Sequence, residues 1–189
     1  SHIDFSSGEK HIADIKTDKG LVIEFQHSSI KPTEVQCREA FYKNMVWVID
    51  GARLKRSYPC FCKGFSGLRS SKIPGIFLSL LPNKCFPESW VHSSVPVYFD
   101  FQCADPIDQT DRLRDPLWCL FPGRMAGFAV VAGVPREDFI KFSSTNPDLL
   151  FAREMLENIS KLFQLQRAGV ERYPLVAPYR QYPRRRGRL

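Results

Sequence analysis

Two carboxylates and an amide near the N-terminus have the types and the spacing for metal chemistry. Asp14 lies in one short apolar stretch, and Glu24 and Gln26 lie two residues apart in the next. Hard divalent cations bind clustered carboxylate oxygens on a rigid support. Such a site can polarise a phosphodiester and activate a water molecule to cleave it. The alternative is a solvated hairpin that carries two surface acids.

A β-hairpin would bring these groups together. Residues 21–26 are short and rich in β-branched and aromatic side chains, and Asp18-Lys19-Gly20 before them is a turn signal. A three-residue loop with glycine in the left-handed conformation fits this tripeptide. The loop places Thr17 opposite Leu21, which sets the register of the hairpin.

The same register determines which side chains face each other. It places Asp14 opposite Glu24, with Cβ atoms roughly 4.5–5.5 Å apart, so one divalent ion could bind both carboxylates. Because side chains alternate along a strand, Glu24 and Gln26 share one face. Ile23 and Phe25 are then expected to turn to the core.

The next residues predict a helix and a buried strand. Residues 32–43 begin with proline and carry an early glutamate, as helix N-termini often do. Arg38 and Tyr42 are four residues apart and therefore share a helical face. Residues 45–50 form an almost continuous apolar run, typical of a strand buried on both faces. The predicted order is strand, strand, helix, strand.

Four segments in this order carry a resemblance to a known family: residues 11–15, 23–28, 38–42 and 47–51. Together they resemble the nuclease core of the competence protein CoiA-like family, within the PD-(D/E)XK nuclease superfamily. The resemblance implies an α/β fold with a restriction-endonuclease-like core and a mixed central sheet. It also implies a Mg²⁺-dependent DNA endonuclease or related phosphodiesterase, with Mn²⁺ as an alternative metal. The family name suggests a link to natural competence.

The resemblance implies a role for four residues of the hairpin. Asp14 and Glu24 correspond to the metal-binding acids, and the backbone carbonyl of Phe25 corresponds to a third ligand. Gln26 stands where the superfamily usually has lysine. An amide can order the attacking water by hydrogen bonding, but it contributes no charge. Asp14, Glu24 and Gln26 are therefore the expected catalytic residues.

Four further residues are candidates for substrate binding. His27 adjoins Gln26, and Ser28 follows it; the alternatives are that His27 pairs with His11 to fix the hairpin ends and that Ser28 only begins a turn. Arg38 and Tyr42 resemble the Q-x-x-x-Y helix of some of these nucleases, with arginine at the first position. They would position DNA or brace the site, unless they belong to an ordinary packed helix face.

The resemblance is incomplete at the N-terminal end. Relatives of this type usually have a preceding helix that supplies another acid, whereas ten residues precede His11 and Glu9 is not at the corresponding place. We therefore expect that the upstream helix is missing from this chain. The alternative function is a catalytically silent nuclease-like domain that binds DNA or a protein partner.

The formal net charge of +7 fits a DNA partner. Five of the last ten residues are arginine, and without them the charge falls from +7 to +2. Residues 170–189 are expected to be a flexible basic tail, which could add salt-sensitive phosphate affinity or serve only as a soluble terminus. The five arginines of the last ten residues are Arg180, Arg184, Arg185, Arg186 and Arg188.

No apolar run reaches the ~20 residues of a membrane span, and no signal peptide opens the chain. We therefore expect no membrane partner and a cytoplasmic protein. The six cysteines are expected to be reduced thiols. Cys60-Phe61-Cys62 has C-x-C spacing without a second close pair, which disfavours a structural zinc site.

The remaining chain extends the fold. We expect a nuclease-like core over residues 1–56, an accessory β-rich region over 57–148 and an amphipathic helix over 149–169, packed on the sheet or on a partner. Residues 54–75 mix basic and aromatic side chains, so they could line a DNA groove or form a long surface loop. The expected further strands are residues 76–81, 95–101, 117–121 and 127–134.

Overall fold

The structure is a computed structural model that describes residues 2–3, 10–11, 13–53, 56–71, 73–102, 111–153, 156–158 and 160–161. Glu9, Cys103 and the predicted tail over 170–189 lie outside these residues. Within the described residues, no helix is long and apolar enough to cross a membrane.

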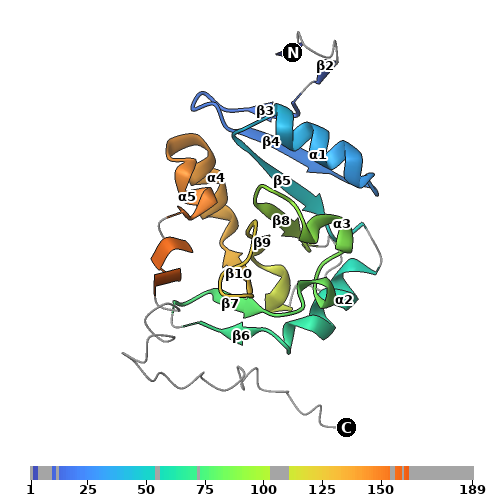
Figure 1. The fold of residues 1–189 in the computed structure, drawn as a ribbon, viewed down its shortest axis with the longest axis vertical. Helices are drawn as coiled ribbons and strands as arrows, with labels where there is room; N and C mark the ends of the chain where they lie inside the picture. The colour runs from blue at the N-terminus through green and yellow to red at the C-terminus, as the bar shows by residue number, and fades with distance from the viewer. Residues whose placement is uncertain are drawn as a thin grey trace.

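One mixed eight-stranded sheet forms the centre of the described chain (Figure 1). Its strands in chain order are β3 (Ile15–Lys16), β4 (Val22–Gln26), β5 (Met45–Asp50), β6 (Arg69–Ser70), β7 (Ile76–Ser79), β8 (Val97–Asp100), β9 (Leu117–Leu120) and β10 (Ala129–Val134). Their order in the sheet is β3-β4-β5-β8-β9-β10-β7-β6. A separate antiparallel pair is formed by β1 (His2–Ile3) and β2 (Lys10–His11).

Five α-helices and two short 3-10 helices are assigned in the described chain. They are α1 (Pro32–Phe41), α2 (Ser57–Phe65), α3 (Glu88–Val91), α4 (Arg136–Thr145), α5 (Asp148–Phe151), η1 (Pro82–Lys84) and η3 (Arg112–Arg114), and α4 and α5 follow the last strand. The chain is therefore an α/β protein, as the sequence predicts.

The predicted hairpin and its register are confirmed. β3 and β4 are antiparallel, with Ile15 opposite Ile23 and Lys16 opposite Val22. Gly20 takes a φ of +79°, the left-handed conformation that glycine adopts most readily. The Thr17 amide donates to the Leu21 carbonyl at 2.9 Å, which closes the loop.

The first four main-sheet elements follow the predicted order of strand, strand, helix, strand. β4 and β5 are parallel and are joined by α1, and β8 adds a third parallel strand beside β5. A parallel pair needs such a crossover connection. Residues 45–50 are predicted to be a strand buried on both faces, and Met45 through Ile49 are indeed buried.

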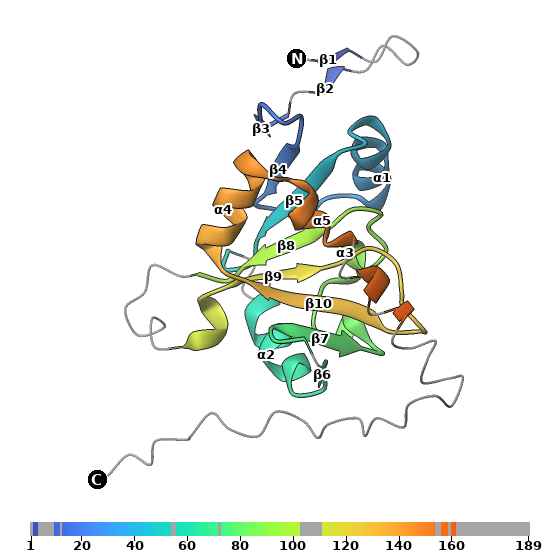
Figure 2. The same ribbon diagram turned by 90° about the vertical axis from the view of Figure 1, so that its left-hand side faces the viewer.

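Helices cover both faces of the sheet, so there are two cores (Figure 2). Side chains of α1, α2 and α3 pack on the face of Val22 and Trp47, whereas those of α4 and α5 pack on the face of Ile23 and Val48. This arrangement corrects one expectation. Ile23 is buried, but Phe25 is 37% exposed and does not join the core.

The four predicted later strands are present as β7, β8, β9 and β10. They continue the sheet that begins with β3 and β4, so strands from both sides of residue 56 are hydrogen-bonded in one sheet. Residues 54–75 do not form one long surface loop, because they contain α2 and β6. Tyr58 and Phe61 of α2 are buried among other aromatic rings, so they are not available to stack on bases.

The helix predicted over 149–169 is interrupted near its start. α5 ends at Phe151, and Ala152 takes a left-handed φ of 47°. Helical residues resume at 153, 156–158 and 160–161. Leu150 and Phe151 are buried in the core beneath α4, so this segment packs on the sheet rather than on a partner.

Candidate metal site and its surroundings

The hairpin brings Asp14 close to Glu24. β3 pairs with β4 at Ile15–Ile23 and Lys16–Val22, and Asp14 lies one residue before β3, at a bend outside the ladder. Asp14 is exposed, and its Oδ2 accepts a hydrogen bond from the Phe25 amide at 2.8 Å. This bond fixes the first carboxylate across the hairpin from the second.

Glu24 is deeply buried beneath α1, with 1% of its surface exposed. Its Oε2 accepts from Arg38 Nη1 at 2.7 Å, and Nη2 of the same guanidinium donates to Glu34 Oε1 at 2.7 Å. Arg38 also lies over the ring of Trp47, 5.9 Å from its centroid. Arg38 therefore bridges a buried carboxylate and an exposed one.

The electrostatics of this face centre on Glu24. Burial raises the pKa of Glu24, and the charge of Asp14 raises it further, while Arg38 opposes both effects. Burial also raises the pKa of Tyr42, with further contributions from the charges of Glu24 and Asp14. Of the two predicted helix residues, Arg38 contacts Glu24 directly, and Tyr42 lies near enough to feel the charges of Glu24 and Asp14.

The residues present fit a divalent cation. Glu24 Oε1 is buried and accepts no hydrogen bond from the described part of the chain, which is a costly state for a carboxylate oxygen. The Phe25 amide points toward Asp14, and in an extended strand the carbonyl of the same residue points to the same side. Two carboxylates and this carbonyl are oxygen donors of the type that Mg²⁺ takes.

The site has two acidic members in the described chain. No group of three or more His, Cys, Asp or Glu side chains with the arrangement of a metal site occurs among the described residues. Mg²⁺ commonly keeps several waters and uses only one or two carboxylates together with substrate phosphates. The pair is therefore chemically sufficient for Mg²⁺ but not for a closed cage of protein ligands.

Gln26 and Ser28 interact with each other at the end of β4. The Gln26 amide nitrogen donates to the Ser28 carbonyl at 2.9 Å and to its hydroxyl at 3.3 Å. Gln26 shares its strand face with Glu24 and is partly exposed. The Ser28 contact also shows that this serine shapes the turn after the strand.

His27 lies on the opposite face and pairs with Asp50. The His27 Nδ1 to Asp50 Oδ2 distance is 3.2 Å, and 56% of the histidine side chain is exposed. The alternative in which His27 pairs with His11 is wrong, because β2 pairs His11 with His2 in the separate two-stranded sheet. The partner of His27 is instead Asp50, at the end of the neighbouring parallel strand β5.

Sequence reasoning missed several polar residues that support this region. Asp100 of β8 lies beside Asp50 in register and is held by both terminal nitrogens of Arg136, at 2.8 and 2.7 Å. Glu34 was missed as the partner of Arg38, although its i,i+4 spacing is a recognised signal for an ion pair. The Asp100–Arg136 pair has no such local signal, because it joins residues 36 positions apart.

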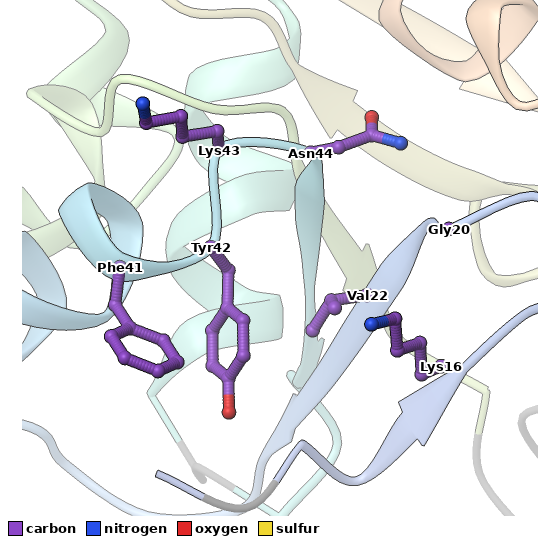
Figure 3. Close-up of a pocket in the computed structure, with 7 residues that line it drawn as sticks. All are labelled: Lys16, Gly20, Val22, Phe41, Tyr42, Lys43 and Asn44. Carbon is purple, nitrogen blue, oxygen red and sulfur yellow. The ribbon is translucent and has the colours of Figure 1, made fainter. Parts of the chain in front are cut away.

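A pocket of about 230 Å³ lies between the start of the hairpin and the end of α1 (Figure 3). Its hairpin wall includes Lys16 and Val22, which belong to the same strand face as Asp14 and Glu24. Figure 3 shows Lys16 reaching from β3 toward Val22 and the ring of Tyr42. The full lining is Lys16, Gly20, Val22, Phe41, Tyr42, Lys43 and Asn44.

Comparison of the chain with protein-family models, with curated proteins and with solved structures found no match.

Proposed function

We propose that this chain is a metal-dependent DNA endonuclease, or a related phosphodiesterase, with a restriction-endonuclease-like core of the CoiA-like kind. The observation that carries the proposal is the closeness of the Asp14 and Glu24 carboxylates across the hairpin, with the buried Glu24 Oε1 lacking a hydrogen-bond partner among the described residues. A divalent cation would satisfy that oxygen and relieve the repulsion between the two carboxylates. The formal charge of +7 supports a polyanionic substrate.

In this proposal the metal is held by Asp14, Glu24 and the Phe25 carbonyl. When bound, Mg²⁺ or Mn²⁺ supplies Lewis-acid polarisation of the scissile phosphate and lowers the pKa of a coordinated water. Gln26, on the same face, accepts a hydrogen bond from the attacking water and orients it. Arg38 stabilises negative charge on the phosphate from the α1 side, and it can do so while Glu34 still holds its second nitrogen.

His27 and Ser28 extend the proposed substrate surface past the end of β4, where His27 lies on the other face from Glu24. His27 is exposed at the end of β4, where the hydrogen bond between its Nδ1 and Asp50 orients the ring. The other ring nitrogen can then contact a phosphate or a base edge. Tyr42 braces Arg38 and Glu24 from the end of α1.

The second candidate is a nuclease-like domain that binds DNA without cutting it. It is favoured by the contact of Arg38 with Glu24, because a guanidinium at 2.7 Å already neutralises one oxygen of the proposed metal ligand. It is also favoured by the glutamine at the lysine position, which adds no positive charge near the scissile phosphate.

The test is cleavage of plasmid and single-stranded DNA with Mg²⁺ or Mn²⁺ by the wild-type chain, Asp14→Asn and Glu24→Gln. We expect each substitution to reduce cleavage by more than the ~10–100-fold that changes to residues behind metal ligands cost. The asparagine side chain of the first variant would keep an acceptor for the Phe25 amide, so the hairpin should remain folded.

Glu137→Gln is the matched control, since this glutamate is exposed on α4 and its replacement removes the same charge. The control should cut like the wild type. Metal-independent DNA binding in EDTA without any cutting by the folded wild type would reject the nuclease in favour of the silent domain.

A further inference from the structure

We propose that the pocket between β3 and the end of α1 binds the nucleic-acid phosphate next to the scissile one. This inference rests on the proposed function, because it takes the Asp14–Glu24 pair as the place of the scissile phosphate. The pocket would hold a second phosphate of the same nucleic-acid strand, and Lys16 would be the principal contact of that phosphate. The ligand is therefore a phosphodiester chain rather than an isolated phosphomonoester.

The spacing along β3 supports two neighbouring subsites. Lys16 belongs to β3 and follows Asp14 by two residues, so the two Cα atoms are at most about 7 Å apart along the chain. Tyr42 lines the pocket from the end of α1, four residues after Arg38. The pocket therefore adjoins the helix whose Arg38 holds Glu24.

The charges at the pocket suit a phosphate. Lys16 lies on the hairpin side, and Lys43 lies where the chain passes from α1 into β5 (Figure 3). Asn44 adds an amide, and its backbone carbonyl already accepts from the Val22 amide at 2.9 Å. None of the side chains that line the pocket is acidic, so the lining itself does not repel a phosphate.

The size of the pocket limits what it can take. Its volume of about 230 Å³ holds a phosphate group with a few waters, but its walls are apolar at Val22 and Phe41. An ammonium is a compact charge that contacts phosphate without reading sequence. The subsite would therefore add affinity for nucleic acid and fix the position of the bound nucleic-acid strand relative to the carboxylates, without discriminating between bases.

The experiment compares Lys16→Gln with Lys19→Gln in the full chain. Lys19 is exposed in the turn of the same hairpin and does not line the pocket, so the control removes an equal charge nearby. Binding of a fluorescein-labelled single-stranded DNA is measured in EDTA at a series of salt concentrations. Cleavage of the same strand is measured with Mg²⁺.

We expect Lys16→Gln to lower the slope of log affinity against log salt by about 0.7, the value for one phosphate contact on a single strand. The cleavage position on a defined oligonucleotide should also become less uniform. Lys19→Gln should change the slope by less than half as much.

Equal slopes for the two variants, with both of them folded by circular dichroism, would overturn the subsite. If Lys16→Gln alone lowers the salt slope and the wild type does not cleave DNA, the phosphate subsite is supported and only the nuclease is rejected. The two proposals therefore fail separately.

Discussion

Glu24 carries its charge in a place where burial opposes ionisation. With 1% of its surface exposed, it depends on Arg38 for neutralisation, and the net effect is still a raised pKa. Breaking a buried pair by removing one partner is usually costly, whereas a neutral isostere can be tolerated. Carboxylates with perturbed pKa values cluster at functional sites.

The pH dependence of stability should report this burial. Because the folded pKa of Glu24 is raised above its ordinary value of 4.5, its contribution to stability is fully present below that pH. The contribution is lost as pH rises through the folded pKa. We expect the free energy of unfolding of the wild type to fall relative to Glu24→Gln over that interval, by about 1.4 kcal/mol for each unit of elevation.

Urea denaturation of the wild type and of Glu24→Gln, from pH 4 to pH 8 without metal, would measure this difference in the free energy of unfolding. Glu137→Gln serves as the exposed reference. A difference between wild type and Glu24→Gln that is constant with pH would show that Glu24 ionises at its ordinary value.

The helix α1 is positioned by a buried carboxylate next to the site. Glu39 is 8% exposed and accepts hydrogen bonds from the Trp47 indole at 3.1 Å and from the Ser93 hydroxyl at 2.6 Å. The Ser94 amide and hydroxyl donate to its other oxygen at 2.9 and 2.6 Å. Glu39 thus ties α1 to β5 and to the turn before β8, and it follows Arg38 directly in the chain.

Replacement of Glu39 by alanine should therefore destabilise the protein strongly. It would leave buried donors on β5 and the 93–94 turn without an acceptor, at a cost of about 3 kcal/mol or more. Glu39→Gln keeps one acceptor oxygen and should cost less. Chemical denaturation measures both values, with the exposed Glu34→Ala as a comparison on the same helix. Equal stabilities for Glu39→Ala and Glu34→Ala would contradict this role of Glu39.

At the scale of the whole molecule, one sheet connects the candidate site with the later strands. The aromatic cluster around Phe61 lies on the same sheet face as α1, with ring centroids 4.8 Å from Phe101 and 5.0 Å from Trp118. Gly51 allows the close passage after β5, because a Cβ there would lie 2.5 Å from the Phe101 ring. The core is thus continuous from β4 to β10.

Phe61→Ala should destabilise the whole sheet, including the strands before residue 56, rather than only the later strands near Phe61. The change creates a cavity in a fully buried cluster, and we expect a loss of about 3–5 kcal/mol. Tryptophan fluorescence and far-ultraviolet circular dichroism should follow one coincident transition in both proteins. Two separate transitions would show that residues 1–56 and 57–148 unfold as independent units.

The local chemistry of the chain was enough to predict much of the candidate site. Asp18-Lys19-Gly20 determined the loop, and the loop determined that Ile15 faces Ile23, because side-chain alternation allows one register for a given turn. Apolar runs likewise predicted β5 and four later strands. These features depend on neighbours close in the chain, where pattern and propensity act directly.

Only the tertiary structure decided how that site is covered and what it contacts. The hairpin pattern cannot show that α1 buries Glu24 under Arg38, or that Phe25 is left at the surface. Nor could it pair His27 with Asp50, since parallel strands meet only after the crossover through α1. Contacts between residues distant in the chain depend on which faces pack together, and packing is a property of the assembled sheet and helices.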